Sequence, residues 1–170
     1  MTVFEYSDPP KEIKKFNYHF QKYMEYEYTK GDVVKYFKLN FDSKIINSPQ
    51  IWSGSFFMKK CDFTFKFLKC WEEASNHIEL LDDSISKSKN HEKFVRMSGE
   101  QSIFSITCKQ NKVHSVSASE CEWAEFNGER KWDHLNNYPI LAKRDKKNNI
   151  LKRFTNRQKK SLKRLIKKFK

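Results

Sequence analysis

The chain has few of the residues that interrupt regular structure. Its 170 residues include only four glycines and four prolines, which excludes a loop-dominated or low-complexity protein. No apolar run approaches the roughly 18 residues that a membrane-spanning helix needs. The first residues also lack the basic and apolar segments of a secretory signal. We therefore expect a globular domain with a real core, in the reducing environment of the cytoplasm.

Motifs for metal, redox and serine chemistry are also missing. The four cysteines have no C-x-x-C spacing and no nearby set of histidines, so neither a zinc site nor a redox motif is indicated, and we expect buried thiols. The five histidines are scattered along the chain. No G-x-S-x-G sequence occurs, which disfavours hydrolysis through a serine nucleophile.

Aromatic residues and basic charge, by contrast, are abundant. Fifteen phenylalanines, seven tyrosines and four tryptophans can bury large areas in a core. The formal charge of +13 comes from residues 143–170, which hold fourteen Lys or Arg and one acid, so that the rest of the chain carries twenty charges of each sign. A body without net charge disfavours nucleic-acid binding across its folded surface.

Residues 146–170 are predicted to form a basic amphipathic helix. Apolar side chains recur on one helical face, with Lys and Arg on the other; the apolar positions include Leu151, Phe154, Leu162, Leu165 and Phe169. This pattern suits an anionic membrane surface, and it equally suits a terminal helix that packs on the body and exposes its basic face. Contact with RNA or DNA is a weaker alternative, because stacking aromatics are not interleaved with the basic residues.

The periodicity of the body mixes helices and strands. Apolar spacing predicts helices over 13–24, 29–39, 62–74 and 100–109, and strands over 51–58 and 113–116. The polar stretch 85–93 is expected to be a surface loop or lid. Together these segments predict an α/β or α+β domain over residues 1–145.

Several motifs occur in an order that resembles a known family. They are Tyr-Thr-Lys-Gly-Asp at 28–32, Gln-Ile-Trp-Ser-Gly at 50–54, Trp71, Leu-Asp-Asp-Ser at 81–84, Glu-Gln-Ser-Ile-Phe-Ser at 100–105, and Pro139-Ile140. Over residues 20–145 this order is similar to the C-terminal half of a bacterial-type glycosyltransferase family of the surface-polysaccharide type, with a GT-A-like, nucleotide-sugar fold. The chain departs from the family at Glu100, where Asp is usual, and at Met97-Ser98-Gly99, where His-Arg-His is common.

The resemblance implies a partial mixed sheet flanked by helices, and transfer of a sugar from a nucleotide sugar to a surface-glycan or lipid-linked acceptor. In that interpretation Glu100 and Gln101 are the catalytic residues, and substrate is bound by Trp52, Gly54, Ser102 and Asp83. Gly54 would let the sugar approach the backbone of its strand. The residues alone also allow a plainer interpretation, in which Glu100 and Gln101 cap a helix and Gly54 relieves packing.

Two parts of such an enzyme are absent from the sequence. There is no Asp-x-Asp to hold a divalent cation and no Gly-rich phosphate loop, and Asp82-Asp83 is expected to be a solvated turn rather than a metal site. The resemblance therefore predicts an acceptor-side half: a truncated chain, a partial domain whose nucleotide-binding half a separate chain supplies, or a remnant that no longer catalyses. The alternative is a non-catalytic, basic peripheral protein that binds an anionic membrane or nucleic acid through its C-terminal helix, at the inner face of the membrane.

Overall fold

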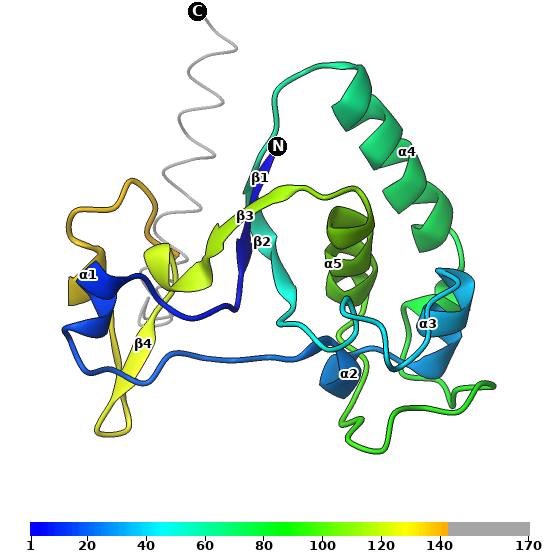
Figure 1. The fold of residues 1–170 in the computed structure, drawn as a ribbon, viewed down its shortest axis with the longest axis horizontal. Coiled ribbons are helices and arrows are strands. Elements are labelled where there is room, and N and C mark those ends of the chain that lie inside the picture. Colours follow the sequence, from blue (N-terminus) through cyan, green and yellow to red (C-terminus); the bar gives the residue numbers. More distant parts are fainter. Residues whose placement is uncertain (143–170) are drawn as a thin grey trace, which may run out of the picture.

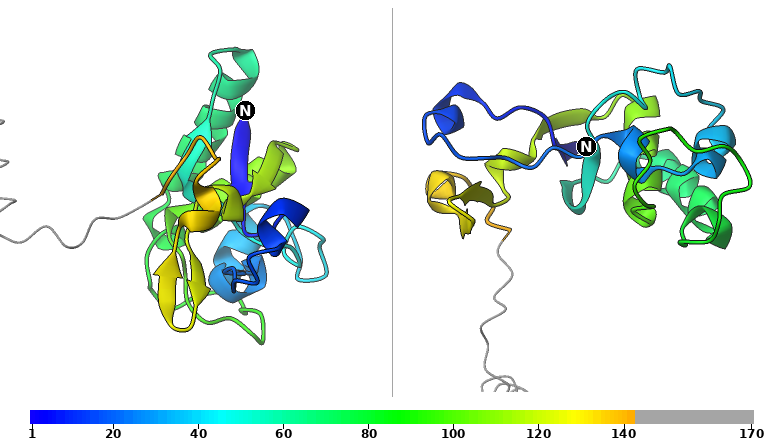
Figure 2. Two further views of the ribbon diagram at one scale, coloured as in Figure 1. Left: turned by 90° about the vertical axis from the view of Figure 1, so that its left-hand side faces the viewer. Right: turned by 90° about the horizontal axis from the view of Figure 1, so that it is seen from below.

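The protein is built around a small central sheet with most of its helices on one side and a hairpin and a short helix on the other (Figure 1). The computed structural model describes residues 1–142. Figure 2 shows the same arrangement from two further directions, with α1 and the hairpin at one end of the molecule and the longer helices at the other. The predicted α/β or α+β class is confirmed at this level, as a mixed fold.

The central sheet has three strands in the order β2-β1-β3. Strand β1 (Thr2–Glu5) pairs antiparallel with β2 (Ile51–Phe57) and parallel with β3 (His114–Ser117). Because successive side chains of a strand point to opposite faces, Val3 and Phe4 enter different cores. Val3 packs in a cluster with Phe67 and Phe104, whereas Phe4 packs with Tyr6 and Cys121.

Two long helices form the helical side of the sheet. Helix α4 (Asp62–Ser75) packs beside α5 (Glu100–Gln110), and α5 in turn packs on β2. Every residue of α5 from Ser102 to Cys108 is buried. The short helix α3 (Gly31–Tyr36) adds Val33 and Val34 to a second core beside α5. The predicted helices at 29–39, 62–74 and 100–109 and both predicted strands are thus confirmed, with shifted ends.

The predicted helix over 13–24 is wrong. Helix α1 covers only Lys11–Lys14, and α2 begins at Glu25 and ends at Tyr28. Between them the chain crosses from the hairpin side to the helical side without forming a helix (Figure 1). Asn17 has a φ of 52°, a left-handed conformation that stops α1 from continuing.

A β-hairpin follows β3 and was not predicted. Strand β4 (Ala124–Phe126) pairs with β5 (Glu129–Lys131) across the turn Asn127-Gly128, in which both residues have positive φ. That turn matches the two-residue hairpin geometry that Asn-Gly favours. Single turns of 3-10 helix also occur, at Ile78–Leu80, Ala118–Glu120 and Asp133–Leu135.

The predicted burial of the cysteines holds for two of the four. Cys108 and Cys121 are buried as expected, but Cys61 and Cys70 are exposed. Within residues 1–142, none of the helices combines the length and apolar character needed to cross a membrane. The basic amphipathic helix predicted for 146–170 lies outside the described residues.

Candidate functional site

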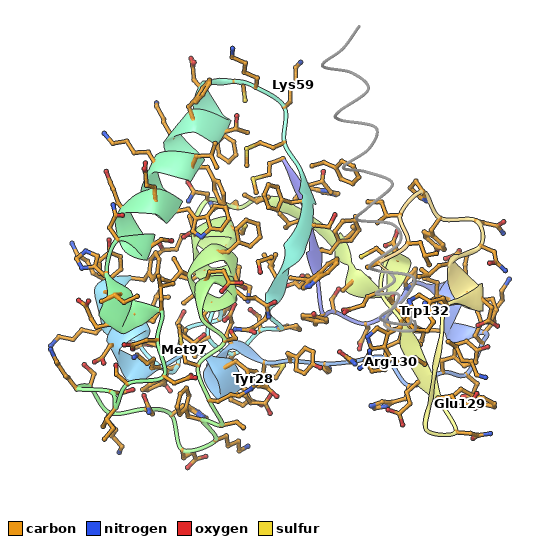
Figure 3. The ribbon with its side chains drawn as sticks, turned by 180° about the vertical axis from the view of Figure 1, so that it is seen from behind. Tyr28, Lys59, Met97, Glu129, Arg130 and Trp132 are labelled. Atoms are coloured by element: carbon orange, nitrogen blue, oxygen red, sulfur yellow. The ribbon has the colours of Figure 1, made fainter. Side chains whose placement is uncertain are left out.

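A cavity of about 430 Å³ lies where the N-terminal end of α5 meets Tyr6, which follows β1, and the residues before and within α2. Its volume falls within the range of ordinary small-ligand sites. The lining is mostly polar or aromatic and consists of Tyr6, Tyr23, Tyr28, Gln50, Leu81, Asp83, Arg96, Met97, Ser98, Gly99 and Gln101. Figure 3 labels Tyr28 and Met97 on this side of the molecule.

Three tyrosine rings form one wall of the cavity. The ring centroids of Tyr6 and Tyr23 are 4.7 Å apart, and those of Tyr23 and Tyr28 are 5.3 Å apart, both at an interplanar angle of 88°. This edge-to-face contact is the geometry that aromatic quadrupoles prefer. Burial raises the pKa of Tyr6 and the nearby Glu122 carboxylate raises it further, so the wall is an uncharged one.

Two amide side chains form the floor in a defined orientation. The Gln50 Nε2 donates to Glu25 Oε2 at 3.0 Å and to Ser102 Oγ at 3.1 Å. The Gln50 Oε1 must then be the acceptor on the other side, and it accepts from Gln101 Nε2 at 2.9 Å. Within residues 1–142 the side-chain oxygen of Gln101, Oε1, makes no hydrogen bond, so it can accept one from a ligand in the cavity.

A buried ion pair holds this floor in place. Glu25 is fully buried, and its carboxylate accepts from Lys109 Nζ at 2.8 Å, from Thr29 Oγ1 at 3.0 Å, and from the Ser105 hydroxyl. Lys109 also donates to the Pro49 carbonyl at 2.6 Å. A buried charge pair tolerates loss of hydration only when its remaining hydrogen-bonding positions are filled, as they are here. The pair joins α2, the start of β2 and α5 under the cavity.

The start of α3 ties down the loop that forms the opposite wall. The buried Lys30 ammonium donates to the Asp82 carboxylate at 3.2 Å and to the Ser84 carbonyl at 3.3 Å. Asp32 accepts from the backbone N–H groups of residues 87 and 88, at 2.9 and 2.7 Å. Burial raises the pKa of Asp32, but these hydrogen bonds outweigh it and hold the pKa below its usual value. The segment 85–93 has no helix or strand, as predicted, but it is attached at several points.

The predicted site residues divide between the cavity and its surroundings. Gln101 and Asp83 line the cavity together, and Ser102 lies buried beneath it, where its hydroxyl donates to the Tyr28 carbonyl at 2.7 Å. Glu100 is exposed and lies outside the lining. Adjacent residues of an α-helix point about 100° apart, so Glu100 and Gln101 do not face the same ligand.

Trp52 and Gly54 line a second hollow, a groove of about 850 Å³ that shares Tyr6, Tyr23 and Arg96 with the cavity. A Cβ added to Gly54 would lie 2.3 Å from ring atoms of Trp52. The close approach at this glycine is therefore made by an indole of the same strand, as the packing interpretation expected.

The groove also contains residues that the sequence predictions missed. Trp123, Arg130 and Trp132 reach it from the hairpin and its flanks. The signal that could have found them is Asn127-Gly128, because an Asn-Gly pair between short polar and apolar alternations is a strong hairpin signal.

The carboxylates near the cavity do not form a metal centre. The Asp82 carboxylate accepts hydrogen bonds from Ser84 and Lys30, and these bonds keep the pKa of Asp82 below its usual value. Within residues 1–142 no group of three or more His, Cys, Asp or Glu side chains could hold a metal ion. Asp83, by contrast, is an exposed carboxylate at the rim of the cavity.

The cavity can therefore bind a polar, ring-shaped ligand by stacking on tyrosines and by hydrogen bonds to Asp83, Ser98 and Gln101. It offers one carboxylate that could accept a proton. In comparisons with known proteins, no family model, no curated protein and no solved structure matches this chain.

Proposed function

We propose that the cavity binds a sugar, and that the chain is the acceptor-side part of a glycosyltransferase with a GT-A-like fold. The reaction transfers a sugar from a nucleotide sugar to a surface-glycan or lipid-linked acceptor. The observation that carries the proposal is that Gln101 and Asp83 meet in one cavity beside a wall of three tyrosines. An aromatic ring face beside a few fixed polar groups is what a hydroxylated ring requires.

The orientation of the Gln101 amide supports this proposal. Because its Nε2 is committed to Gln50, its oxygen can accept from a sugar hydroxyl without first rearranging. The buried Glu25–Lys109 pair fixes Gln50, and Gln50 fixes Gln101. A side-chain oxygen that is already held in place in this way loses little conformational entropy when it accepts a hydrogen bond from a ligand.

In the proposed reaction Asp83 is the general base. It is the one carboxylate among the residues that line the cavity, and it would accept the proton of the attacking acceptor hydroxyl. The proposal assigns no step to Glu100, because its exposed side chain lies outside the lining. A divalent cation, which sugar-nucleotide donors often need, has no fitting cluster of ligands within residues 1–142, so no step is assigned to it.

The test is binding of uridine- and guanosine-linked sugars, and of the free sugars, measured by titration calorimetry and by saturation-transfer NMR. Gln101→Ala and Asp83→Asn should each weaken binding about tenfold, as expected for loss of a hydrogen bond to a sugar hydroxyl. Any transfer to an acceptor that the unaltered chain catalyses should be lost in Asp83→Asn.

Glu100→Gln is the matched control, since it changes the neighbouring residue on the same helix outside the cavity. It should bind as the unaltered chain does. If Glu100→Gln weakens binding as much as Gln101→Ala, the assigned site is wrong. If no sugar or sugar nucleotide binds, the alternative of a non-catalytic peripheral protein is favoured.

A further inference from the structure

The groove beside the cavity has the chemistry of a second binding site. Three indoles line it: Trp52 from β2, and Trp123 and Trp132 from either side of the hairpin. All three are only partly buried. Figure 3 labels Trp132 and Arg130 on the hairpin side, away from Tyr28 and Met97 on the helical side. A run of partly exposed indoles in one hollow is more than packing requires and provides flat surfaces for rings.

Two arginines give the groove its charge. The Arg130 guanidinium lies 4.2 Å from the ring centroid of Trp123, so it is stacked on the indole. A stacked guanidinium keeps its edge N–H donors available and already oriented for a carboxylate. Neither Arg130 nor Arg96 forms an ion pair with any residue between 1 and 142.

Both arginines line the groove together with Tyr23. Burial and the charge of the Glu122 carboxylate raise the pKa of Tyr23, and the positive charges of Arg96 and Arg130 act in the opposite direction. Tyr23 and Arg96 also line the sugar cavity. Arg96 therefore lies where the groove joins the cavity, and Arg130 lies in the groove alone.

We propose that this groove binds an acidic oligosaccharide, whose pyranose rings stack on the indoles and whose carboxylate is held by Arg96 and Arg130. The continuous lining through Tyr6 and Tyr23 makes the groove an extension of the cavity. The inference deepens the proposed function, on which it rests, by naming the acceptor as an acidic glycan. The growing chain occupies the groove and presents its end to the cavity.

A single-stranded nucleic acid is the other polyanion that stacks on aromatics. Such ligands need a groove that is positive along its length to follow the phosphates. Here a carboxylate, Glu122, lies within the same lining as the two arginines, and the chain outside residues 143–170 has no net charge. Isolated positive charge between ring-sized surfaces fits a glycan with one acidic group on each repeat better than it fits a phosphate backbone.

The experiment titrates the full chain with four probes: an oligogalacturonate, a neutral maltooligosaccharide of the same length, inorganic phosphate and a deoxythymidine oligonucleotide. The oligogalacturonate should bind most tightly. Arg130→Gln and Arg96→Gln should each weaken it at least about tenfold, since each removes a hydrogen bond between charged groups. Trp132→Ala should weaken both oligosaccharides.

Lys131→Gln is the matched control, because it removes a positive charge from the adjacent residue, which pairs with Glu129 at 2.6 Å and lies outside the groove lining. Circular dichroism of each variant shows whether it is folded. Equal binding of acidic and neutral oligosaccharides, equal loss in Lys131→Gln, or tighter binding of the oligonucleotide that depends on Arg130, would each overturn the inference.

The same titration separates this inference from the proposed function. Sensitivity of oligogalacturonate binding to Arg130→Gln, without any binding of free sugars or sugar nucleotides that depends on Gln101, would support the groove and contradict the sugar cavity. Sugar-nucleotide binding that depends on Gln101, with no binding of oligogalacturonate, would do the reverse.

Discussion

At the scale of single residues, the buried Glu25 carboxylate is the group on which the cavity floor depends. Glu25→Ala would leave the Lys109 ammonium buried without its partner. Breaking a buried pair in this way costs about 3–5 kcal/mol. We expect the free energy of unfolding, measured by urea denaturation, to fall by that amount, and sugar binding to fall with it because Gln50 loses its orientation.

The Lys69–Glu73 pair on α4 provides the control. It has the same residue types four positions apart, with a separation of 4.0 Å and both side chains largely exposed. Exposed pairs contribute less than about 1 kcal/mol, so Glu73→Ala should leave stability almost unchanged. Equal losses in the two variants would mean that the Glu25 network does not stabilise the fold.

The sequence predicted part of the candidate site, at the start of α5. The block at 100–105 was correctly placed at a helix start, but the sequence pattern could not tell which of Glu100 and Gln101 faces inward. That choice depends on the rotation of α5, which is set by the burial of Ser102 to Cys108 against the sheet and neighbouring helices. The hydrogen-bond partner of the Gln101 side chain is Gln50, which lies 51 residues away in the sequence. Local periodicity cannot predict a contact over that distance.

At the scale of elements, the start of α3 acts as the anchor of the 82–98 loop. A Cβ on Gly31 would lie 2.2 Å from the carbonyl oxygen of Lys89, so Gly31→Ala forces the two segments apart. Overpacking of this kind costs about 1–3 kcal/mol. We expect faster amide hydrogen exchange over residues 84–98 and weaker sugar binding, because Asp83 and Arg96 lie on the displaced loop.

Lys35→Ala is the control on the same helix, since Lys35 is exposed and lies outside the contact with the loop. It should leave exchange in the loop unchanged. Unchanged exchange in Gly31→Ala would show that the loop is not held by this contact.

Elements with a single periodicity were predictable, and the segment with two was not. The apolar residues of helix α4 recur at intervals of three and four, and strand β2 is a short aromatic run that follows the turn residues Asn47-Ser48-Pro49. Residues 16–20 have aromatics at a helical spacing, Phe16 and Phe20, and at an alternating one through Tyr18. The structure follows the alternation, because all three rings surround His134 at centroid distances between 5.4 and 6.2 Å. Packing against His134, which is distant in the sequence, therefore determines the conformation of residues 16–20.

At the scale of the whole molecule, His134 makes stability depend on pH. It is buried among these aromatic rings, and burial lowers its pKa more than the Glu122 carbonyl and Asp133 raise it. The unfolded chain, with an ordinary histidine pKa of about 6.5, therefore binds more protons than the folded one below that pH. The free energy of unfolding should decrease as pH falls through this range, and levels off below the folded-state pKa.

His134→Gln should reduce that decrease, measured by urea denaturation at a series of pH values between neutral and mildly acidic. His114→Gln, which changes an exposed histidine on β3, is the control and should keep it. A pH dependence that is the same in His134→Gln would assign the effect to other groups.

The excess of basic residues is confined to the C-terminal end of the chain. Residues 143–170 carry fourteen basic residues and one acid, and the remainder is balanced. Attraction to anionic lipid contributes about 1 kcal/mol for each basic residue at the surface. The whole chain should therefore co-sediment with phosphatidylglycerol vesicles, and a chain ending at residue 145 should not.

Phosphatidylcholine vesicles should bind neither, and added salt should release the whole chain because it screens these charges. Equal sedimentation of the two chains would assign membrane attachment to the body, whose exposed Phe63 and Phe65 on α4 would then be the residues to change.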